Sequence, residues 1–413
     1  MILRDLLRRL DWRAWVLQDV GNSAFATTIL AVLYPLYYRE VLGAGAEASS
    51  VLAWWGYVSA LSMLLTALLA PGLGALADGA GRRKGALLAA TALGVGASAA
   101  MGLLGEGHWV WGLALFALGS LGFSFNNVFY DSFLPHLAAP EERAGLSSAG
   151  YALGYLGGGT LLVANAALAG FWGEAGFRLS FLSVALWWGL FTLPFLRHVG
   201  EPPPSPREPG ETWGASAYGR PWRTLLGLRH QPDLLWFLGA FWLYNDGIGT
   251  IMRMGVLYGS SLGLGQGTLL GALVATQFVG VPCTILFGRL AGRWGDRRVL
   301  LAGLGGYLAL CAFIPFVVRP WHFWVLALGV GVVQGGTQAL SRSLFASLVP
   351  KERSAELYGF YDLSSKFAGV LGPFLFGLLA QLTGSLRMGG PVLGLFFLGG
   401  MAMLRRVRAG GRP

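Results

Sequence analysis

Residues 74–84 read Gly-Ala-Leu-Ala-Asp-Gly-Ala-Gly-Arg-Arg-Lys, a short basic turn that is rich in glycine. Apolar runs at 51–73 and 85–104 flank it. A related turn, Gly-Arg-Leu-Ala-Gly-Arg-Trp-Gly-Asp-Arg-Arg, occupies residues 288–298, again between two apolar runs. Aligned without a gap, the two turns coincide at Gly74/Gly288, Leu76/Leu290, Ala77/Ala291, Gly81/Gly295 and Arg83/Arg297. Such an internal repeat predicts two homologous halves of one membrane domain.

The composition favours an integral membrane protein. Of the 413 residues, 54% are hydrophobic and only 12% are charged, whereas a soluble domain carries roughly 25% charged residues. The 64 glycines suit helices that pack closely in lipid. The net charge of +10 falls in loops between apolar runs. We therefore attribute it to contact with anionic membrane lipids and expect no nucleic-acid partner.

The apolar runs predict the fold. A helix needs about 20 apolar residues to cross a bilayer. Six runs of about that length are expected at 16–38, 51–76, 85–104, 109–134, 145–169 and 179–196, and six more at 234–257, 268–288, 299–318, 323–348, 357–382 and 388–404. The predicted fold is an all-α membrane protein with twelve transmembrane helices in two parallel six-helix repeats. The bundles are expected at 1–196 and 234–413, joined by a cytoplasmic linker at 197–233 that is rich in proline and arginine.

The basic residues predict the orientation. Most of the 30 Lys and Arg residues lie at the two ends of the chain, in the linker, in the two basic turns and in the loops on that same side. Because Lys and Arg accumulate in cytoplasmic loops, we expect both termini to face the cytoplasm. The predicted location is the cell (inner) membrane.

The turn at 74–84, placed between the second and third expected helices, resembles the signature turn of the major facilitator superfamily, G-x-L-A-D-x-x-G-R-[RK]. The matching residues are Gly74, Leu76, Asp78, Gly81, Arg82 and Arg83. The second turn has Gly292 where the signature has aspartate. The resemblance implies alternating access, in which two halves rock about a central cavity lined by helices 1, 4, 7 and 10.

A narrower resemblance comes from the first helix. Residues 19–28 read Asp-Val-Gly-Asn-Ser-Ala-Phe-Ala-Thr-Thr, which is similar to the D-W-A-N-S-A-[FY] start of the vacuole-effluxer branch of that superfamily. Residues 130–135 and 150–159 resemble the same branch. The chain departs from the pattern at Val20 and Gly21, where tryptophan and alanine are usual. Eukaryotic members of the branch are autophagy-linked amino-acid effluxers, so the resemblance implies amino-acid export.

Polar side chains inside the apolar runs are the candidates for substrate binding, because an ionised group at the bilayer centre costs roughly 2.5–3.5 kcal/mol on insertion scales. Asp246 and Arg253 lie on one face of the seventh helix. They could receive the two charges of a zwitterion or form structural pairs, and Asp246 could instead carry a coupling proton. The amide candidates, which could bind substrate or join helices, are Asn22, Asn126, Asn127, Asn245, Gln334 and Gln338.

Two sets of charged residues are expected to act as gates. Asp78 could cap the N-terminus of a neighbouring helix and pair with Arg82 or Arg83 in one conformation, or it could serve only as a topology anchor. Asp131 in the fourth helix and Arg342 in the tenth occupy nearly equivalent positions. They could form an inner gate between the halves, or each could pair within its own half.

Other polar residues have structural explanations. Asp362 and Lys366 lie four residues apart and are expected to pair. Tyr34, Tyr37 and Tyr38 lie near a span end, where the interfacial aromatic belt explains them.

The sequence contains no P-loop of the form G-x-x-x-x-G-K-[ST] and shows no nucleophile–base or metal-ligand cluster. We expect Cys283 and Cys311 to be small buried hydrophobic residues. The prediction is a monomeric secondary active transporter of a small polar solute, with amino acids favoured, and not an enzyme. No cofactor is expected, and a proton is the candidate coupling ion. The alternatives are a transporter of a sugar, drug or organic ion, and a lipid flippase; a receptor or an enzyme is least favoured.

Overall fold

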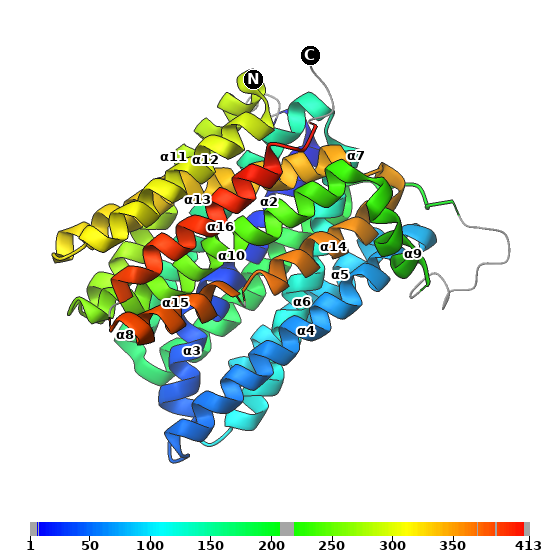
Figure 1. Ribbon diagram of the computed structural model, residues 1–413. Coiled ribbons are helices and arrows are strands. Elements are labelled where there is room, and N and C mark those ends of the chain that lie inside the picture. Colours follow the sequence, from blue (N-terminus) through cyan, green and yellow to red (C-terminus); the bar gives the residue numbers. More distant parts are fainter. Residues whose placement is uncertain (1–5, 7, 207–218, 370, 385, 409–413) are drawn as a thin grey trace. The chain divides into compact units, whose positions relative to one another are not determined.

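The computed structural model describes residues 6, 8–206, 219–369, 371–384 and 386–408, and all regular structure in these ranges is helical (Figure 1). In the first half the helices are α2 (Leu10–Ala24), η1 (Phe25–Val32), α3 (Leu33–Tyr37), η2 (Tyr38–Leu42), α4 (Ala48–Ala80), α5 (Arg83–Met101), α6 (Trp109–Ser132), α7 (Leu134–Leu137) and α8 (Pro140–His198). In the second half they are α9 (Arg220–Gly227), η4 (Leu228–His230), α10 (Pro232–Ser261), α11 (Gln266–Trp294), α12 (Asp296–Phe313), η5 (Ile314–Phe316), α13 (Pro320–Leu348), η6 (Lys351–Arg353), α14 (Ser354–Phe367), α15 (Leu371–Thr383), η7 (Leu386–Met388) and α16 (Gly389–Leu404).

These helices give the twelve membrane crossings that the sequence predicted. Nine stretches of the described residues are long and apolar enough to cross a membrane. One of them, Pro140–His198, holds two helices that meet at Gly173, whose φ of 55° and ψ of −129° are not helical. Dividing that stretch at Gly173 and adding α10 and the shorter α16 completes the set.

The chain forms two compact units. Unit 1 contains Met1–Leu137, Leu153–Tyr218 and Glu352–Gly359, and unit 2 contains Ala138–Ala152, Gly219–Lys351 and Phe360–Pro413. Each unit thus includes a short segment from the opposite half of the sequence. Helix α14 contributes its first turns to unit 1 and the rest to unit 2. The bundle boundaries at 196 and 234 stay a prediction.

The first membrane helix of unit 1 is not regular. It passes through two π-helical stretches, η1 and η2, and such turns often mark functional segments of a helix. Tyr34, Tyr37 and Tyr38 are at most 1% exposed, so their assignment to an interfacial belt is wrong. Each hydroxyl donates to a backbone carbonyl elsewhere in unit 1 at 2.6–3.2 Å, because a buried phenol needs an acceptor.

The eleventh membrane helix is also interrupted. The sequence predicted one helix over 357–382, but the structure has two, α14 and α15, which end at Phe367 and begin at Leu371. Glycine is a poor helix former, and proline removes a backbone donor; Gly369 and Pro373 stand at this break. The break leaves backbone N–H and C=O groups without helical partners beside α10. Helix α10 is the seventh membrane helix and carries Asp246 and Arg253.

The remaining structural predictions have mixed outcomes. The expected Asp362–Lys366 pair is confirmed, with Nζ and Oδ1 3.6 Å apart. Cys311 is buried as expected, but Cys283 is only partly buried; both are free thiols.

Candidate transport site and gating turn

The signature turn of unit 1 is closed by a buried ion pair. Nε of Arg83 lies 2.5 Å from Oδ1 of Asp78, and both side chains are fully buried. The Asp78 carboxylate also accepts the backbone N–H of Ala355 at 3.2 Å and of Glu356 at 2.9 Å, in the first turn of α14. Free N–H groups and the helix dipole favour an anion at that position. The helix cap and the arginine pair predicted for Asp78 are therefore both present, while its gating role stays a prediction.

Arg83 uses its other donors within the same unit. Nη1 donates to Nε2 of His136 at 2.6 Å, and Nη2 donates to the backbone carbonyl of Glu352 at 3.1 Å. Arg82, which the sequence grouped with Arg83, is exposed. Of the two arginines, Arg83 is therefore the partner of Asp78. His136 was not predicted, because it lies outside the signature turn.

A second carboxylate caps the helix that leaves the turn. The side chain of Glu201 accepts the backbone N–H of Arg83 at 2.7 Å and of Lys84 at 3.0 Å, at the start of α5. The backbone N–H of Ser205 donates to the carbonyl of Asp78 at 2.8 Å. The first residues of the predicted linker thus belong to the turn, a role that their proline-rich composition did not indicate.

Gly74 permits the close contact between the turn and α14. A Cβ atom on Gly74 would collide with the backbone of Ala355. The backbone cannot yield as a side chain can, so any larger residue would displace the start of α14 from the Asp78 carboxylate.

Unit 1 also contains a buried cluster of amides, which joins α2 and α6. Nδ2 of Asn22 donates to Oδ1 of Asn127 at 2.8 Å and to Oδ1 of Asn126 at 3.3 Å. Nδ2 of Asn126 donates to the hydroxyl of Thr91 at 2.7 Å, and Nε2 of Gln18 donates to Oδ1 of Asn126 at 3.3 Å. The structure thus brings together three of the four asparagines that the sequence selected, Asn22, Asn126 and Asn127. Gln18 and Thr91 were missed, although Gln18 lies one helical turn before Asn22.

Among the described residues, each unit has one buried side-chain amide oxygen that lacks a donor. Oε1 of Gln18 in the amide cluster, and Oε1 of Gln334 on α13, are buried without a hydrogen-bond partner among the residues that the structure describes. A buried polar atom left unpaired costs about 1–3 kcal/mol. Both atoms are acceptors, so each could take a hydrogen bond from an N–H or O–H group of a bound solute.

In unit 2, α10 binds both ends of the break in the eleventh helix. Asp246 is 1% exposed, and its carboxylate oxygens lie 3.1 and 3.0 Å from the backbone nitrogen of Gly372, in the first turn of α15. Nη1 of Arg253 donates to the carbonyl of Gly369 at 2.8 Å. In a regular helix the carbonyl of Gly369 would accept the N–H of residue 373, four positions later, but Pro373 has no N–H. The carboxylate thus meets the positive end of a helix, and the guanidinium meets a carbonyl that the break leaves free.

The other substrate-binding candidates of unit 2 lie on α10 and α13. Nδ2 of Asn245 donates to the hydroxyl of Ser365 on α14 at 3.2 Å. Gln334 is 9% exposed, and Gln338 is half-buried one turn further along α13. Asn245, Asp246 and Arg253 thus each form a hydrogen bond with α14, with α15 or with the residues between them.

Arg342, the proposed gate residue of α13, is held within unit 2. Its Nε and Nη2 donate to the hydroxyl and carbonyl oxygens of Ser147, at 2.9 and 3.0 Å. Its guanidinium carbon lies 4.3 Å from the centroid of the Tyr151 ring, a cation–π contact. Asp131 belongs to unit 1, so an Asp131–Arg342 gate stays a prediction.

Comparison with known proteins identifies relatives over most of the chain. The model of a family described as vacuole effluxer Atg22 like matches residues 41–410. The MFS-type transporter YxiO of Bacillus subtilis is 38% identical over 381 residues, which cover 90% of this chain and 88% of the relative. Autophagy-related protein 22 of Yarrowia lipolytica is 29% identical over 288 residues, covering 62% of this chain but only 48% of the fungal protein.

Solved structures share the fold at low sequence identity. The human organic anion transporter MFSD10 superposes with a TM-score of 0.76 at 15% identity, over 96% of this chain and 99% of that one. The proton:xylose symporter XylE gives a TM-score of 0.73 at 14% identity, over 97% and 95%. With the family match over 41–410, these similarities show that the chain is a multi-pass membrane protein of the major facilitator superfamily and belongs to the vacuole effluxer Atg22-like family.

Proposed function

We propose that this protein exports a small polar solute with N–H donors, amino acids being the favoured class, across the cell membrane by alternating access. The proposed orientation places both termini in the cytoplasm. The description of the family as effluxers supports export. The observation that carries the proposed cargo class is the pair of unpartnered amide acceptors, Oε1 of Gln18 and Oε1 of Gln334.

The chemistry of these acceptors favours a cationic or amino group. An ammonium has three donors and no acceptor, so it could pair with a carbonyl oxygen that the protein leaves without a donor. The amides nearest Gln18 are Asn126 and Asn22, which are neutral and buried. They offer further hydrogen bonds without the desolvation cost of a second charge. A sugar hydroxyl could use the same acceptors, and this makes a sugar the main alternative cargo.

The gating part of the proposal rests on the ion pair of the signature turn. The Asp78 carboxylate binds both Arg83 and the start of α14. A contact that is present in one conformation and absent in the other biases a two-state transporter by about 1–3 kcal/mol. We therefore propose that separation of α14 from Asp78 accompanies the change of access.

Counterflow in proteoliposomes tests the cargo. Labelled amino acids and, separately, labelled hexoses are offered to the wild type, with and without a pH gradient. We expect saturable counterflow of one or more amino acids. Loss of a charge-assisted hydrogen bond should weaken apparent affinity by roughly tenfold or more in Gln18→Leu and Gln334→Leu. Gln381→Leu, on an exposed position of α15, is the matched control.

Asp246→Asn separates coupling from binding. If Asp246 carries the coupling proton, this variant should keep counterflow and lose the response to the pH gradient.

In the counterflow test of the wild type, saturable hexose flux would replace the amino-acid assignment with the sugar alternative. Absence of flux for every amino acid, from protein that is folded and monodisperse, would refute the proposed cargo.

A further inference from the structure

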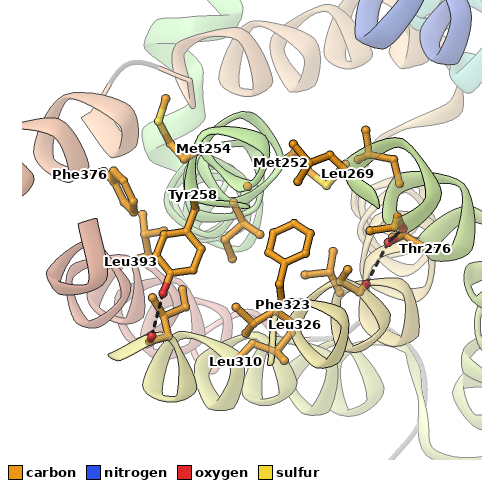
Figure 2. Close-up of a pocket in the computed structure, with 17 residues that line it drawn as sticks. Met252, Met254, Tyr258, Leu269, Thr276, Leu310, Phe323, Leu326, Phe376 and Leu393 are labelled. Carbon is orange, nitrogen blue, oxygen red and sulfur yellow. Dashed lines mark hydrogen bonds between the residues drawn. The ribbon is translucent and has the colours of Figure 1, made fainter. Parts of the chain in front are cut away.

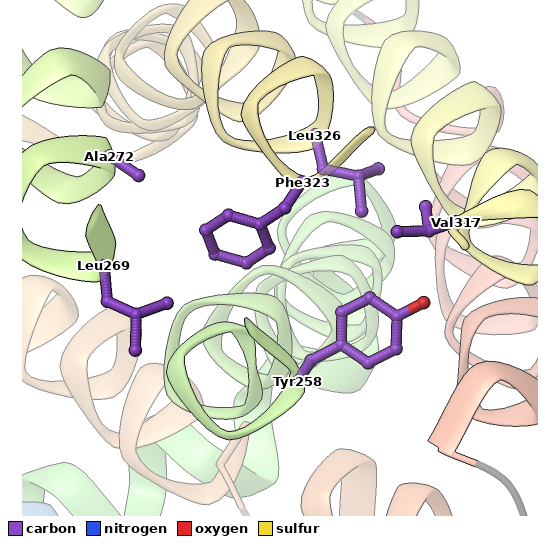
Figure 3. Close-up of a cluster of buried hydrophobic side chains, with 6 residues drawn as sticks. All are labelled: Tyr258, Leu269, Ala272, Val317, Phe323 and Leu326. Carbon is purple, nitrogen blue, oxygen red and sulfur yellow. The ribbon is translucent and has the colours of Figure 1, made fainter. Parts of the chain in front are cut away.

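Unit 2 contains a second site that the candidate transport residues do not use. A cavity of about 100 Å³ lies among α10, α11, α13 and α16 (Figure 2). The ring of Phe323 projects between Tyr258 and Leu269 in this view. These three residues also belong to a cluster of buried hydrophobic side chains (Figure 3). The cavity is thus continuous with a packed apolar core and is not a polar cleft.

The polar atoms on the wall already have acceptors in the protein. The hydroxyl of Tyr258 donates to the carbonyl of Ile314 at 3.2 Å. The hydroxyl of Thr276 lies 2.8 Å from the carbonyl of Ala272 and 3.0 Å from that of Ala327. Almost all of the remaining wall is hydrocarbon. Apolar cavities of this size exclude water and bind apolar molecules, so a polar solute is a poor occupant.

We propose that this cavity binds the acyl chain of a membrane lipid. The walls are helices with apolar outer faces: on α13, Phe323 and Leu326 line the cavity, whereas Val325 and Leu328 are 44% and 37% exposed. In a protein that spans the membrane, these exposed side chains meet acyl chains, which are therefore the most abundant apolar group beside the cavity. The inference does not rest on the cargo proposed above.

The wall also suits a flexible occupant. Met252 lies on one side of the cavity and Met254 on the other (Figure 2). Methionine is unbranched and adapts its shape to what it contacts. A chain of methylene groups has no fixed shape, so adaptable side chains can follow it as it moves.

Photolabelling locates the acyl chain. The protein is reconstituted in phosphatidylcholine that carries a diazirine near the end of one acyl chain, and the insertion sites are mapped by peptide mass spectrometry. Helix α13 supplies an internal contrast between Phe323 and Leu326, which line the cavity, and Val325 and Leu328, which face outward. We expect adducts at both pairs of positions in the wild type.

Filling the cavity should remove only the inner adducts. In Ala272→Leu, adducts at Phe323 and Leu326 should fall about tenfold because the added side chain takes the space, while those at Val325 and Leu328 stay unchanged. Ala327→Leu fills the cavity from α13 and serves if the first variant does not fold. Ala309→Leu, at an exposed position of α12, is the control. Adducts confined to the outward positions, or inner adducts that persist in the folded filled variants, would overturn the proposal.

Discussion

The two basic turns share residues but not chemistry. The turn of unit 1 buries the Asp78–Arg83 ion pair and caps the start of α14. In unit 2 the corresponding position is Gly292, which is exposed and has no atom within 4 Å of where a Cβ would lie. Arg297, the counterpart of Arg83, binds the backbone carbonyl of Val407 instead of a carboxylate.

What the repeat retains is a glycine packed closely against a segment from the opposite half of the sequence. Gly74 lies against Ala355, in the segment of unit 1 that comes from the second half of the sequence. Gly288 lies against Ser148, in the segment of unit 2 that comes from the first half. The closely packed glycine is therefore present in both turns, whereas the buried Asp78–Arg83 ion pair has no counterpart at Gly292 and Arg297. The second turn has its carboxylate at Asp296, which interacts with Ser343 and Arg143 instead of with Arg297. We infer that loss of the Asp78 carboxylate destabilises the protein more than a change at Gly292 does.

The largest expected effect is that of Asp78→Asn. Arg83 would remain buried without a countercharge, and removing one partner of a buried pair typically costs about 3–5 kcal/mol. We expect a large fall in the unfolding temperature in detergent, together with lost transport. An unfolding temperature equal to that of the wild type would show that the ion pair does not stabilise unit 1.

Arg83→Lys should have the next largest effect. Lysine keeps the charge but cannot reproduce the donors that reach Asp78, His136 and the carbonyl of Glu352. Loss of charged hydrogen bonds predicts about 1.5–3 kcal/mol of destabilisation. The same change at Arg297, which is only partly buried, should be milder in the same thermal assay. Equal effects at the two arginines would contradict the contrast between the turns.

Alanine at the two closely packed glycines tests this packing. Gly74→Ala meets the backbone of Ala355, whereas in Gly288→Ala the nearest obstacle is the Ser148 side chain, 2.6 Å from the new Cβ. Overpacking costs about 1–3 kcal/mol, and we expect Gly74→Ala at the upper end and Gly288→Ala at the lower. Measured unfolding temperatures in the reverse order would show that the second approach is the tighter one.

The smallest effect is expected from Gly292→Asp, which places an aspartate at the position that matches Asp78. The position is exposed and a Cβ there has no near neighbour, so the new carboxylate has no helix terminus to cap. Surface changes of this kind stay within about ±0.5 kcal/mol. If Gly292→Asp stabilised the protein by as much as Asp78→Asn destabilises it, unit 2 would be able to form the same arginine pair and helix cap as unit 1.

The candidate site was predictable in part. Asn22, Asn126 and Asn127 were selected because amides inside apolar runs are conspicuous, and they contact one another. Gln18 lies near the start of its apolar run and was not selected, although its Oε1 is one of the two buried amide oxygens without a donor among the described residues. Asp246 and Arg253 were correctly placed on one helix, but their contacts with the broken eleventh helix were not expected. No local pattern states which distant backbone group will need a donor or an acceptor.

The sequence by itself determined the membrane class, the twelve helices and the position of the signature turn. These features follow from the length of apolar runs and the residues that interrupt them, which are local properties. Only the tertiary structure decided that Arg83, and not Arg82, pairs with Asp78, and that Asp78 caps a helix 278 positions further along the chain. Such partners depend on which segments pack together. A buried charge is satisfied by whatever group packing brings within hydrogen-bond distance.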